Sequence, residues 1–199
     1  LIPRFYDVAD GAVFLDGYDV RQMDFASIYS KIGYIPQQAF LFSGTIADNL
    51  RYGKEDATDA ELWRALEIAQ AKDFVEKLPD GLYSMISQNG TNLSGGQKQR
   101  LCIARAIVKE ALFYMFDDSF SALDFATDAR LRRALKENLK NSSILIVAQR
   151  VGTIIDADKI IVLDRGQVVG TGTHEELLQS CNVYKDIVAS QLSEEEATE

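Results

Sequence analysis

Short apolar runs alternate along the chain with longer stretches in which apolar residues recur every three or four positions. Compact apolar runs bounded by turn residues are typical of strands, and the three-to-four spacing is typical of helices. The continuous apolar character of the runs near the middle of the chain favours strands buried on both faces of a parallel sheet. We expect strands at residues 12–15, 32–35, 112–116, 143–148, 159–163 and 167–170.

The region between residues 45 and 110 has a different pattern, with helical spacing and no clear strand. This spacing is clearest over 59–70 and 97–110, and it returns over 124–139. Thr173, followed three residues later by Glu176, is a capping box that predicts a further helix start. The pattern therefore predicts an α/β body interrupted by a helical insert. The expected divisions are 1–44 (partial core), 45–110 (helical), 111–192 (core) and 193–199 (acidic tail).

Composition and charge exclude several classes of protein. The chain is 47% hydrophobic and 26% charged, which is typical of an ordered globular domain. No apolar run approaches the roughly 20 residues that span a bilayer. The net charge is −9, with no basic stripe to neutralise a phosphate backbone, so nucleic acid is not expected as a partner. Cys102 and Cys181 lack metal-ligand spacing and are predicted to be reduced thiols.

The most informative string stands at the start of a predicted helix. A serine and two glycines there expose backbone N–H groups to an anion, and the helix dipole favours negative charge at that end. Ser-Gly-Gly alone is more consistent with a helix start that binds no ligand. The longer block is rarer, and it resembles the signature motif of the ATP-binding-cassette (ABC) ATPases: Leu93-Ser94-Gly95-Gly96-Gln97.

Further motifs resemble the same family and follow in the family's order. Residues 112–118 are similar to a Walker B strand that ends in paired carboxylates, and 121–124 are similar to the D-loop. Gln37 matches the Q-loop glutamine, with Gln38 as the alternative, and residues 42–46 and 172–177 are similar to stretches of the exporter branch. The resemblance covers essentially the whole chain. It implies an α/β P-loop NTPase (RecA-like, ABC ATPase) core with an inserted α-helical subdomain.

The resemblance also implies cofactors and residue roles. ATP and Mg²⁺ would be the cofactors, with Mg²⁺ bound through Asp117 and a neutral oxygen of Gln37. Asp118 would orient the attacking water, and Gln149 would lie at the switch position. The nucleotide of a partner would contact Ser94, Gly95, Gly96, Gln97 and Asp124. From the residues alone, Asp117 is also consistent with a solvated aspartate at a strand end.

Three positions depart from the family pattern. Asp118 replaces the usual glutamate and is shorter by one methylene, about 1.5 Å of reach. Gln149 replaces the switch histidine and can neither carry positive charge nor shuttle a proton. Gln88 replaces a glutamate in the loop that faces the transmembrane domains in the family. The chain's single histidine, His174, is expected to be a helix-start residue.

A larger departure is that no Walker A motif, G-x-x-x-x-G-K-[ST], occurs in the sequence. Residues 1–8 resemble the helix that follows the P-loop in exporters, so the chain is expected to begin just after it. The N-terminal strands and the P-loop would then be missing. Without P-loop amides and lysine to bind the β- and γ-phosphates, the isolated fragment is expected to have no ATPase activity.

Together these features resemble the degenerate half of a heterodimeric exporter. The implied partners are a second nucleotide-binding domain and a transmembrane domain fused N-terminally, at the cytoplasmic face of the plasma (inner) membrane. One alternative is a regulatory module that supplies a signature to a partner and hydrolyses little itself. Another is a non-transport ABC ATPase of the chromosome-maintenance type, which the acidic charge and the lack of coiled-coil heptads disfavour.

Overall fold

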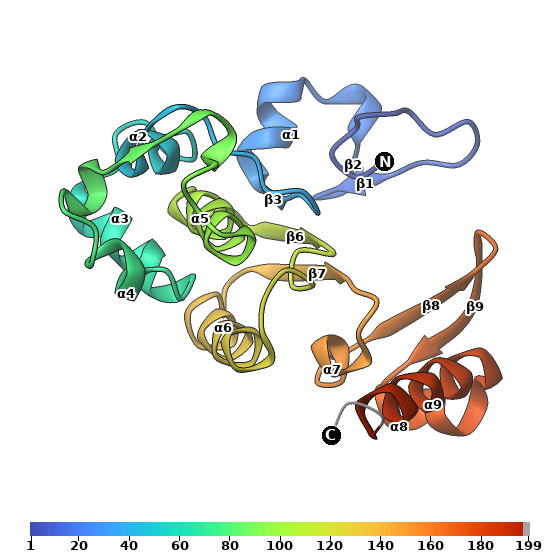
Figure 1. Ribbon diagram of the computed structural model, residues 1–199. Helices are drawn as coiled ribbons and strands as arrows, with labels where there is room; N and C mark the ends of the chain where they lie inside the picture. Colours follow the sequence, from blue (N-terminus) through green and yellow to red (C-terminus); the bar gives the residue numbers. More distant parts are fainter. Residues whose placement is uncertain (197–199) are drawn as a thin grey trace. The chain divides into compact units, whose positions relative to one another are not determined.

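The computed structural model describes residues 1–196, and the chain divides into two compact units, Leu1–Val147 and Ala148–Glu199 (Figure 1). Of the predicted acidic tail, residues 193–196 form the end of helix α9 (Asn182–Glu196), and 197–199 lie outside the described residues. The units separate inside the region 111–192 that the sequence groups together. The four predicted divisions therefore remain a proposal.

A parallel sheet forms the centre of the first unit. Its strands are β3 (Ile32–Ile35), β6 (Phe113–Asp117) and β7 (Ser143–Val147), in the order β3-β6-β7. In the register, Ile35 pairs with Phe116 and Asp117 pairs with Val147. The carboxyl ends of these strands meet at one edge, where the predicted Walker B carboxylates lie. The strand predictions at 32–35, 112–116 and 143–148 are confirmed to within one residue.

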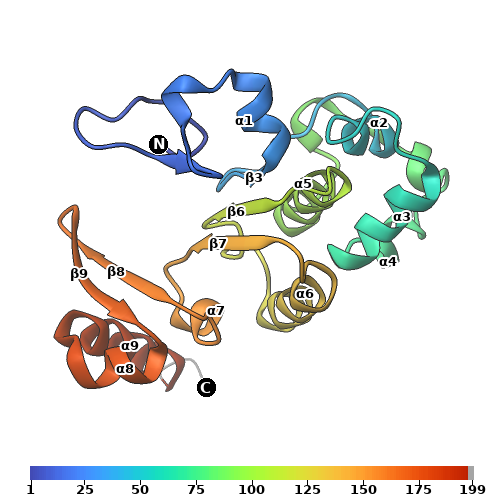
Figure 2. The same cartoon turned by 180° about the vertical axis from the view of Figure 1, so that it is seen from behind.

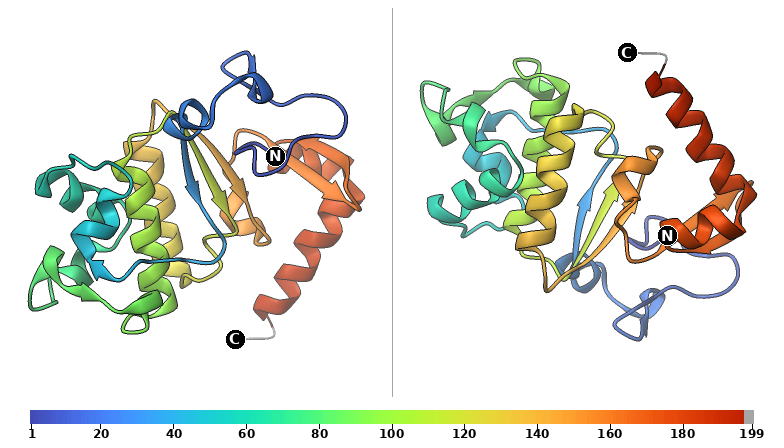
Figure 3. Two further views of the ribbon diagram at one scale, coloured as in Figure 1. Left: turned by 90° about the horizontal axis from the view of Figure 1, so that it is seen from above. Right: turned by 90° about the horizontal axis from the view of Figure 1, so that it is seen from below.

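Helices α5 (Gly95–Val108) and α6 (Phe125–Asn138) lie on one face of this sheet (Figure 3). Beyond α5 pack α2 (Ile46–Arg51), α3 (Asp59–Ile68) and α4 (Lys72–Val75). One apolar cluster joins these layers, and fully burying each large side chain contributes about 1.5–3 kcal/mol. Its members include Leu50, Leu62, Leu66, Leu101, Phe116, Leu131 and Leu135.

Two-residue strands β4 (Gly44–Thr45), at the start of the helical region, and β5 (Met85–Ile86), within it, form an antiparallel ladder. The expectation of no clear strand between 45 and 110 is therefore wrong for β5. Two residues are too few to produce a recognisable alternation, and their pairing depends on contacts far apart in sequence. Short 3₁₀ helices η2 (Gly81–Tyr83) and η3 (Gln88–Gly90) flank β5.

The first residues of the chain form turns, and the helix that residues 1–8 resemble is absent. The Arg4 N–H donates to the Leu1 carbonyl (2.9 Å), and Arg4 has φ +54°, which is incompatible with a right-handed helix. The Arg4 guanidinium donates to the carbonyls of Val20 (3.1 Å) and Met23 (3.2 Å). These tertiary hydrogen bonds favour the turn over a helix.

A hairpin and a short helix connect this segment to the sheet. Strands β1 (Phe14–Leu15) and β2 (Tyr18–Asp19) pair across an Asp16-Gly17 turn, so the strand predicted at 12–15 is shorter than expected. The 3₁₀ helix η1 (Val20–Gln22) follows. Helix α1 (Phe25–Lys31) then begins at Asp24, whose carboxylate accepts a hydrogen bond from the Ser27 N–H (2.8 Å).

The second unit contains helix α7 (Val151–Ile154) and an antiparallel hairpin, β8 (Ile160–Asp164) and β9 (Gln167–Gly172), packed against α8 (His174–Ser180) and α9 (Figure 2). The predicted hairpin and the capping box of Thr173 and Glu176 are confirmed. His174 is the first residue of α8, as expected, and its Nδ1 lies 2.8 Å from the Tyr184 hydroxyl.

Cys102, in the first unit, and Cys181, in the second, are buried free thiols, as the sequence predicts. Among the described helices, none has the length and apolar character required to cross a bilayer.

Candidate functional site

The carboxylate edge, defined as Tyr34, Gln37, Asp117 and Asp118, lies where β3 and β6 end. Asp117 is the last residue of β6, and Asp118 follows with φ +45°. The Asp118 N–H donates to the Val147 carbonyl (2.9 Å), which extends the contact between β6 and β7 by one residue. A left-handed conformation costs a non-glycine residue about 1–2 kcal/mol, and such strain is concentrated at functional sites.

Two side chains from β3 and the loop after it contact these carboxylates. The Tyr34 hydroxyl donates to Asp117 Oδ2 (3.1 Å), and Gln37 Nε2 donates to Asp118 Oδ2 (3.1 Å). Burial raises the pKa of the Tyr34 phenol, and the adjacent Asp117 carboxylate raises it further. The structure therefore brings Gln37, Asp117 and Asp118 together, as predicted, and favours Gln37 over the alternative Gln38. Their chemical roles remain predictions.

The signature turn, residues 94–97, begins helix α5. The Ser94 hydroxyl accepts from the Gln97 N–H (3.2 Å), and Gln97 Oε1 accepts from the Ser94 N–H (2.9 Å), which completes a capping box. Because these groups bond to one another, the first-turn N–H groups of the two glycines are the natural donors to an anion at this helix start.

The two signature glycines have different surroundings. A Cβ added at Gly95 would meet no atom within 4 Å, whereas one at Gly96 would lie 3.2 Å from the Ala122 carbonyl oxygen. Gly96 is thus adapted to close packing against the D-loop of its own chain. Nothing in the described structure requires a glycine at position 95, so the open space there is where an external group can approach the backbone.

The D-loop connects the carboxylate edge to the signature turn. The Ser121 hydroxyl donates to the Asp118 carbonyl (2.8 Å), and Ala122 packs against Gly96. Asp124 caps helix α6, accepting from the Thr127 N–H (2.9 Å), and hydrogen bonds from Thr127 lower the pKa of its carboxyl group. The geometry gives Asp124 a capping role, and its predicted contact with a nucleotide remains a prediction.

Gln149 belongs to the second unit, Ala148–Glu199. Its carbonyl accepts a hydrogen bond from Gln191 Nε2 (2.5 Å) of α9, and Gln191 Oε1 accepts from the Val151 N–H (2.8 Å). Helix α9 thereby fixes the backbone that follows β7. The predicted switch role of Gln149 remains a prediction.

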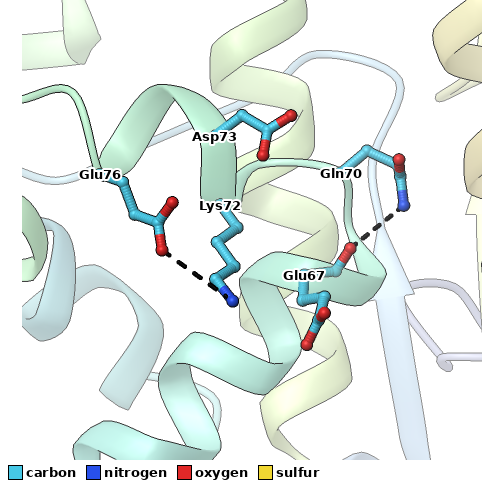
Figure 4. Close-up of a pocket in the computed structure, with 5 residues that line it drawn as sticks. All are labelled: Glu67, Gln70, Lys72, Asp73 and Glu76. Atoms are coloured by element: carbon cyan, nitrogen blue, oxygen red, sulfur yellow. Dashed lines mark hydrogen bonds and ion pairs between the residues drawn. The ribbon is translucent and has the colours of Figure 1, made fainter.

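Two surface hollows of similar size accompany this site in the first unit. One, of about 390 Å³, lies between α3 and α4 and is lined by charged and polar residues (Figure 4): Glu67, Gln70, Lys72, Asp73 and Glu76. Lys72 Nζ lies 3.9 Å from Glu76 Oε1, four positions further along the chain. No predicted site residue lines this hollow. The residues predicted to act on a nucleotide lie instead at the carboxylate edge and at the signature turn.

The second hollow, of about 380 Å³, is lined mainly by aromatic and cationic residues. Phe42 is central to it, with its ring centroid 5.0 Å from that of Phe40 and 4.5 Å from that of Tyr52. All three residues are exposed, Phe40 at 49%, Phe42 at 41% and Tyr52 at 66%. The complete lining also contains Pro3, Phe5, Tyr29, Ile32, Gly33, Tyr34, Gly53, Arg105, Ala106 and Lys109.

Comparison with known proteins assigns the chain to a family. The sequence profile described as ABC transporter matches residues 1–121, which is more than half of the chain. The chain belongs to the ABC transporter family. The predicted resemblance and the α/β P-loop NTPase fold class are therefore confirmed.

Two curated relatives illustrate the match of this ABC transporter chain. An uncharacterized ABC transporter ATP-binding protein of Mycobacterium tuberculosis is 48% identical over 194 residues, covering 96% of this chain and 33% of the relative. An ATP-dependent lipid A-core flippase of Albidiferax ferrireducens is 43% identical over 188 residues, covering 94% of this chain and 32% of the relative. The chain thus spans about a third of the length of these proteins.

A solved structure agrees with this assignment. The structure of a bacterial Atm1-family ABC exporter with ATP bound matches with a TM-score of 0.93 and 35% identity, covering 96% of this chain and 34% of that one. The described part of this chain therefore has the fold of an ABC exporter nucleotide-binding domain.

The oxygen donors at the carboxylate edge are suited to Mg²⁺ bound together with a nucleotide. Mg²⁺ commonly takes one or two carboxylates and completes its shell with water and phosphate oxygens. Asp117, Asp118 and Gln37 offer that kind of donor set. Within the described residues there is no group of three or more His, Cys, Asp or Glu side chains that could enclose a metal by itself. The residues present therefore fit a metal shared with phosphates.

Two contributors to the site were missed at the level of sequence. Tyr34 bonds Asp117, and Gln99 Nε2 donates to the Pro36 carbonyl beside Gln37 (3.2 Å). Gln99 had a detectable signal, because it is a polar residue three positions before Cys102, on the apolar face of the predicted helix. Tyr34 had none, because tyrosine is common in strands for packing alone.

Proposed function

We propose that this chain is the greater part of the nucleotide-binding domain of an ABC exporter subunit, and that it participates in ATP hydrolysis that drives export. The observation that supports this most directly is the pairing of an oxygen-rich carboxylate edge with a separate helix start open at Gly95. Such elements suit two different nucleotides: one bound beside the carboxylates, and one bound by a second domain facing the signature turn.

In this proposal each residue has a distinct role. When bound, Mg²⁺ would supply charge stabilisation to the phosphate oxygens during transfer. Asp117 would bind the metal, with the Tyr34 hydroxyl orienting its carboxylate. Asp118 would accept a hydrogen bond from the attacking water, and Gln37 would orient Asp118 through the bond at 3.1 Å. Gln149 would hydrogen-bond a phosphate oxygen without moving a proton.

The subunit's own site would be degenerate. Asp118 has less reach than a glutamate, and it already accepts a hydrogen bond from Gln37, which competes with a water molecule. Misplacing a catalytic group by about 1 Å can reduce rates by 10²-fold. The signature turn has an intact capping box and two glycines, so we infer that it completes the competent site of a partner domain. The assembly would then be a heterodimer.

The partner that transmits the motion would be a transmembrane domain, at the cytoplasmic face of the membrane. The exposed aromatic hollow around Phe40, Phe42 and Tyr52 is a surface of the first unit that suits an apolar contact. Arg105 and Lys109 line the same hollow, but Arg105 already donates to the Phe40 carbonyl and Lys109 to the carbonyls of Tyr29 and Ile32. The partner would therefore contact chiefly the aromatic rings.

The test uses the full-length subunit that contains this chain, purified with its partner subunit, with ATP turnover as the readout. Ser94→Arg should reduce turnover by about 10²-fold or more, because a bulky cation would block the signature turn. Asp118→Ala should change turnover little. Ser180→Arg, at an exposed serine of α8, is the matched control for adding an arginine. The proposal is wrong if Ser94→Arg leaves turnover intact and Asp118→Ala abolishes it.

A second candidate function is a regulatory module that binds nucleotide and hydrolyses almost none at its own site. Asp118 and Gln149 favour it, because neither matches the group that the family uses at that position. Asp118→Glu separates the two functions. It should increase turnover of the assembled transporter if the shorter side chain limits a working site, and it should have no effect if the site is purely regulatory.

A further inference from the structure

One face of helix α5 carries three side chains that donate to the loop after β3. Gln99 Nε2 donates to the Pro36 carbonyl (3.2 Å), and Cys102 Sγ (3.4 Å) and Arg105 Nη2 (2.9 Å) both donate to the Phe40 carbonyl. The three residues are spaced three positions apart and therefore lie along a single side of the helix. Both ends of the segment from Pro36 to Phe40 are thus bonded to α5.

Gln99 is the most deeply buried donor of this set, with only 1% of its surface exposed. A buried amide is costly unless it is hydrogen-bonded, and an apolar side chain of similar size would fill the same space without that cost. Packing alone therefore does not explain a glutamine here. The partner that accounts for it is the Pro36 carbonyl.

The residue after this carbonyl is Gln37, whose side chain donates to Asp118. Pro36 has a fixed φ, so the direction in which the chain enters position 37 depends on how Pro36 is placed. A continuous path therefore runs from α5 through Gln99, Pro36 and Gln37 to the Asp118 carboxylate. Each step in it is a covalent connection or a hydrogen bond of 3.1–3.2 Å.

We propose that Gln99 is a positioning residue that fixes the loop containing Gln37 to the signature helix. A displacement of the signature turn is then transmitted to the hydrogen bond between Gln37 and Asp118. This inference rests on the proposed function, because it assigns a purpose to the link between the two halves of the site. The D-loop provides a second connection, through the contact of Ala122 with Gly96, so α5 contacts both loops next to the carboxylates.

The test uses the full 199-residue chain without nucleotide, and it measures hydrogen exchange of the Gln37 side-chain amide and of backbone amides 37–42 by NMR. Gln99→Met keeps the size and removes the donor. It should speed exchange of these groups about five- to tenfold, the factor expected for one lost hydrogen bond, while amides in β6 change little. Gln70→Met, which removes an exposed amide bonded to the Glu67 carbonyl (3.1 Å), is the matched control.

Gln99→Glu keeps the shape of the side chain, and its carboxyl group can donate a hydrogen bond only when it is protonated. It therefore tests whether restoring the donor restores slow exchange. At pH 9 its carboxylate cannot donate and repels the Pro36 carbonyl, so exchange at residues 37–42 should be fast. At pH 6 burial keeps the carboxyl protonated, so it donates again and exchange, corrected for the intrinsic pH dependence, should return toward that of the parent chain. Gln99→Met should show no such recovery.

The inference is overturned if Gln99→Met leaves the Gln37 amide unchanged, or if exchange rises equally in β6, which would indicate a purely structural role. No readout here requires ATP, so a failure of the Gln99 link is distinguished from a failure of the proposed function, which the turnover measurements test.

Discussion

The carboxylate edge and the signature turn are built in opposite ways. At the carboxylate edge, Tyr34 and Gln37 bond carboxylates that are 83 and 81 positions away in sequence. At the signature turn, Ser94 and Gln97 bond each other across three positions. The edge therefore exists only when the whole sheet is folded, whereas the turn is specified by its own few residues. Mutations at the carboxylate edge should therefore change the free energy of unfolding through contacts between distant parts of the chain. Mutations at the signature turn should change it through the local capping of helix α5.

The largest effect is expected from the core beneath the carboxylate edge. Phe116, 1% exposed, directly precedes Asp117, and its ring centroid is 5.1 Å from that of Phe120. Phe116→Ala should lower the free energy of unfolding by about 3–5 kcal/mol, because it leaves a cavity in addition to losing apolar burial. Urea unfolding measures this. Leu112→Ala, at a residue 58% exposed, should change stability by less than about 0.5 kcal/mol. Equal losses in the two variants would contradict the assignment of this core.

A smaller effect is expected from the edge's own hydrogen bonds. Tyr34→Phe removes the donor to Asp117 and should lower stability by about 1–2 kcal/mol near pH 7. The pKa of Tyr34 is raised in the folded chain, so the folded state keeps its proton at a pH where the unfolded state, with a pKa of about 10, has lost it.

The contribution of Tyr34 is therefore complete below pH 10, and it is lost as pH rises through the raised pKa. The stability difference between the parent chain and Tyr34→Phe should narrow above pH 10 in denaturant titrations. Tyr18→Phe, at an exposed tyrosine of β2, is the matched control for removing a phenol hydroxyl. A difference that widens above pH 10 would show that the sign is wrong.

The local character of the signature turn gives a third prediction. Ser94→Ala removes the cap of α5 and should lower stability by about 1 kcal/mol. Ser94→Asp should leave stability unchanged, because aspartate caps a helix as well as serine does. It should still impair the assembled transporter, because it places a negative charge where a phosphate is proposed to bind. If Ser94→Asp destabilises the chain as much as Ser94→Ala, the turn depends on more than its cap.

The same contrast explains what the sequence could predict. Helix starts at Ser94, Asp124 and Thr173 were predictable, because their capping residues lie within three positions of their partners. The buried strands were predictable from continuous apolar runs. The β4–β5 ladder and the turn at Arg4 depend on pairings distant in sequence, which no local pattern encodes. The donor roles of Tyr34 and Gln99 were hidden for the same reason.

The smallest expected change in stability comes from the two signature glycines. It separates a glycine that packs within the chain from one that faces open space. Gly95→Ala adds a methyl group to open space in the first turn of a helix, so it should stabilise the chain by about 0.5 kcal/mol. Gly96→Ala places its methyl group 3.2 Å from the Ala122 carbonyl oxygen, so it should be neutral or destabilising by up to about 1 kcal/mol. Paired urea titrations resolve a difference of this size. If both variants are more stable than the parent chain, the D-loop moves to accommodate the added methyl group at position 96. A loss at Gly95 would mean that its glycine serves the chain's own fold, so that position 95 could no longer be attributed to an external ligand.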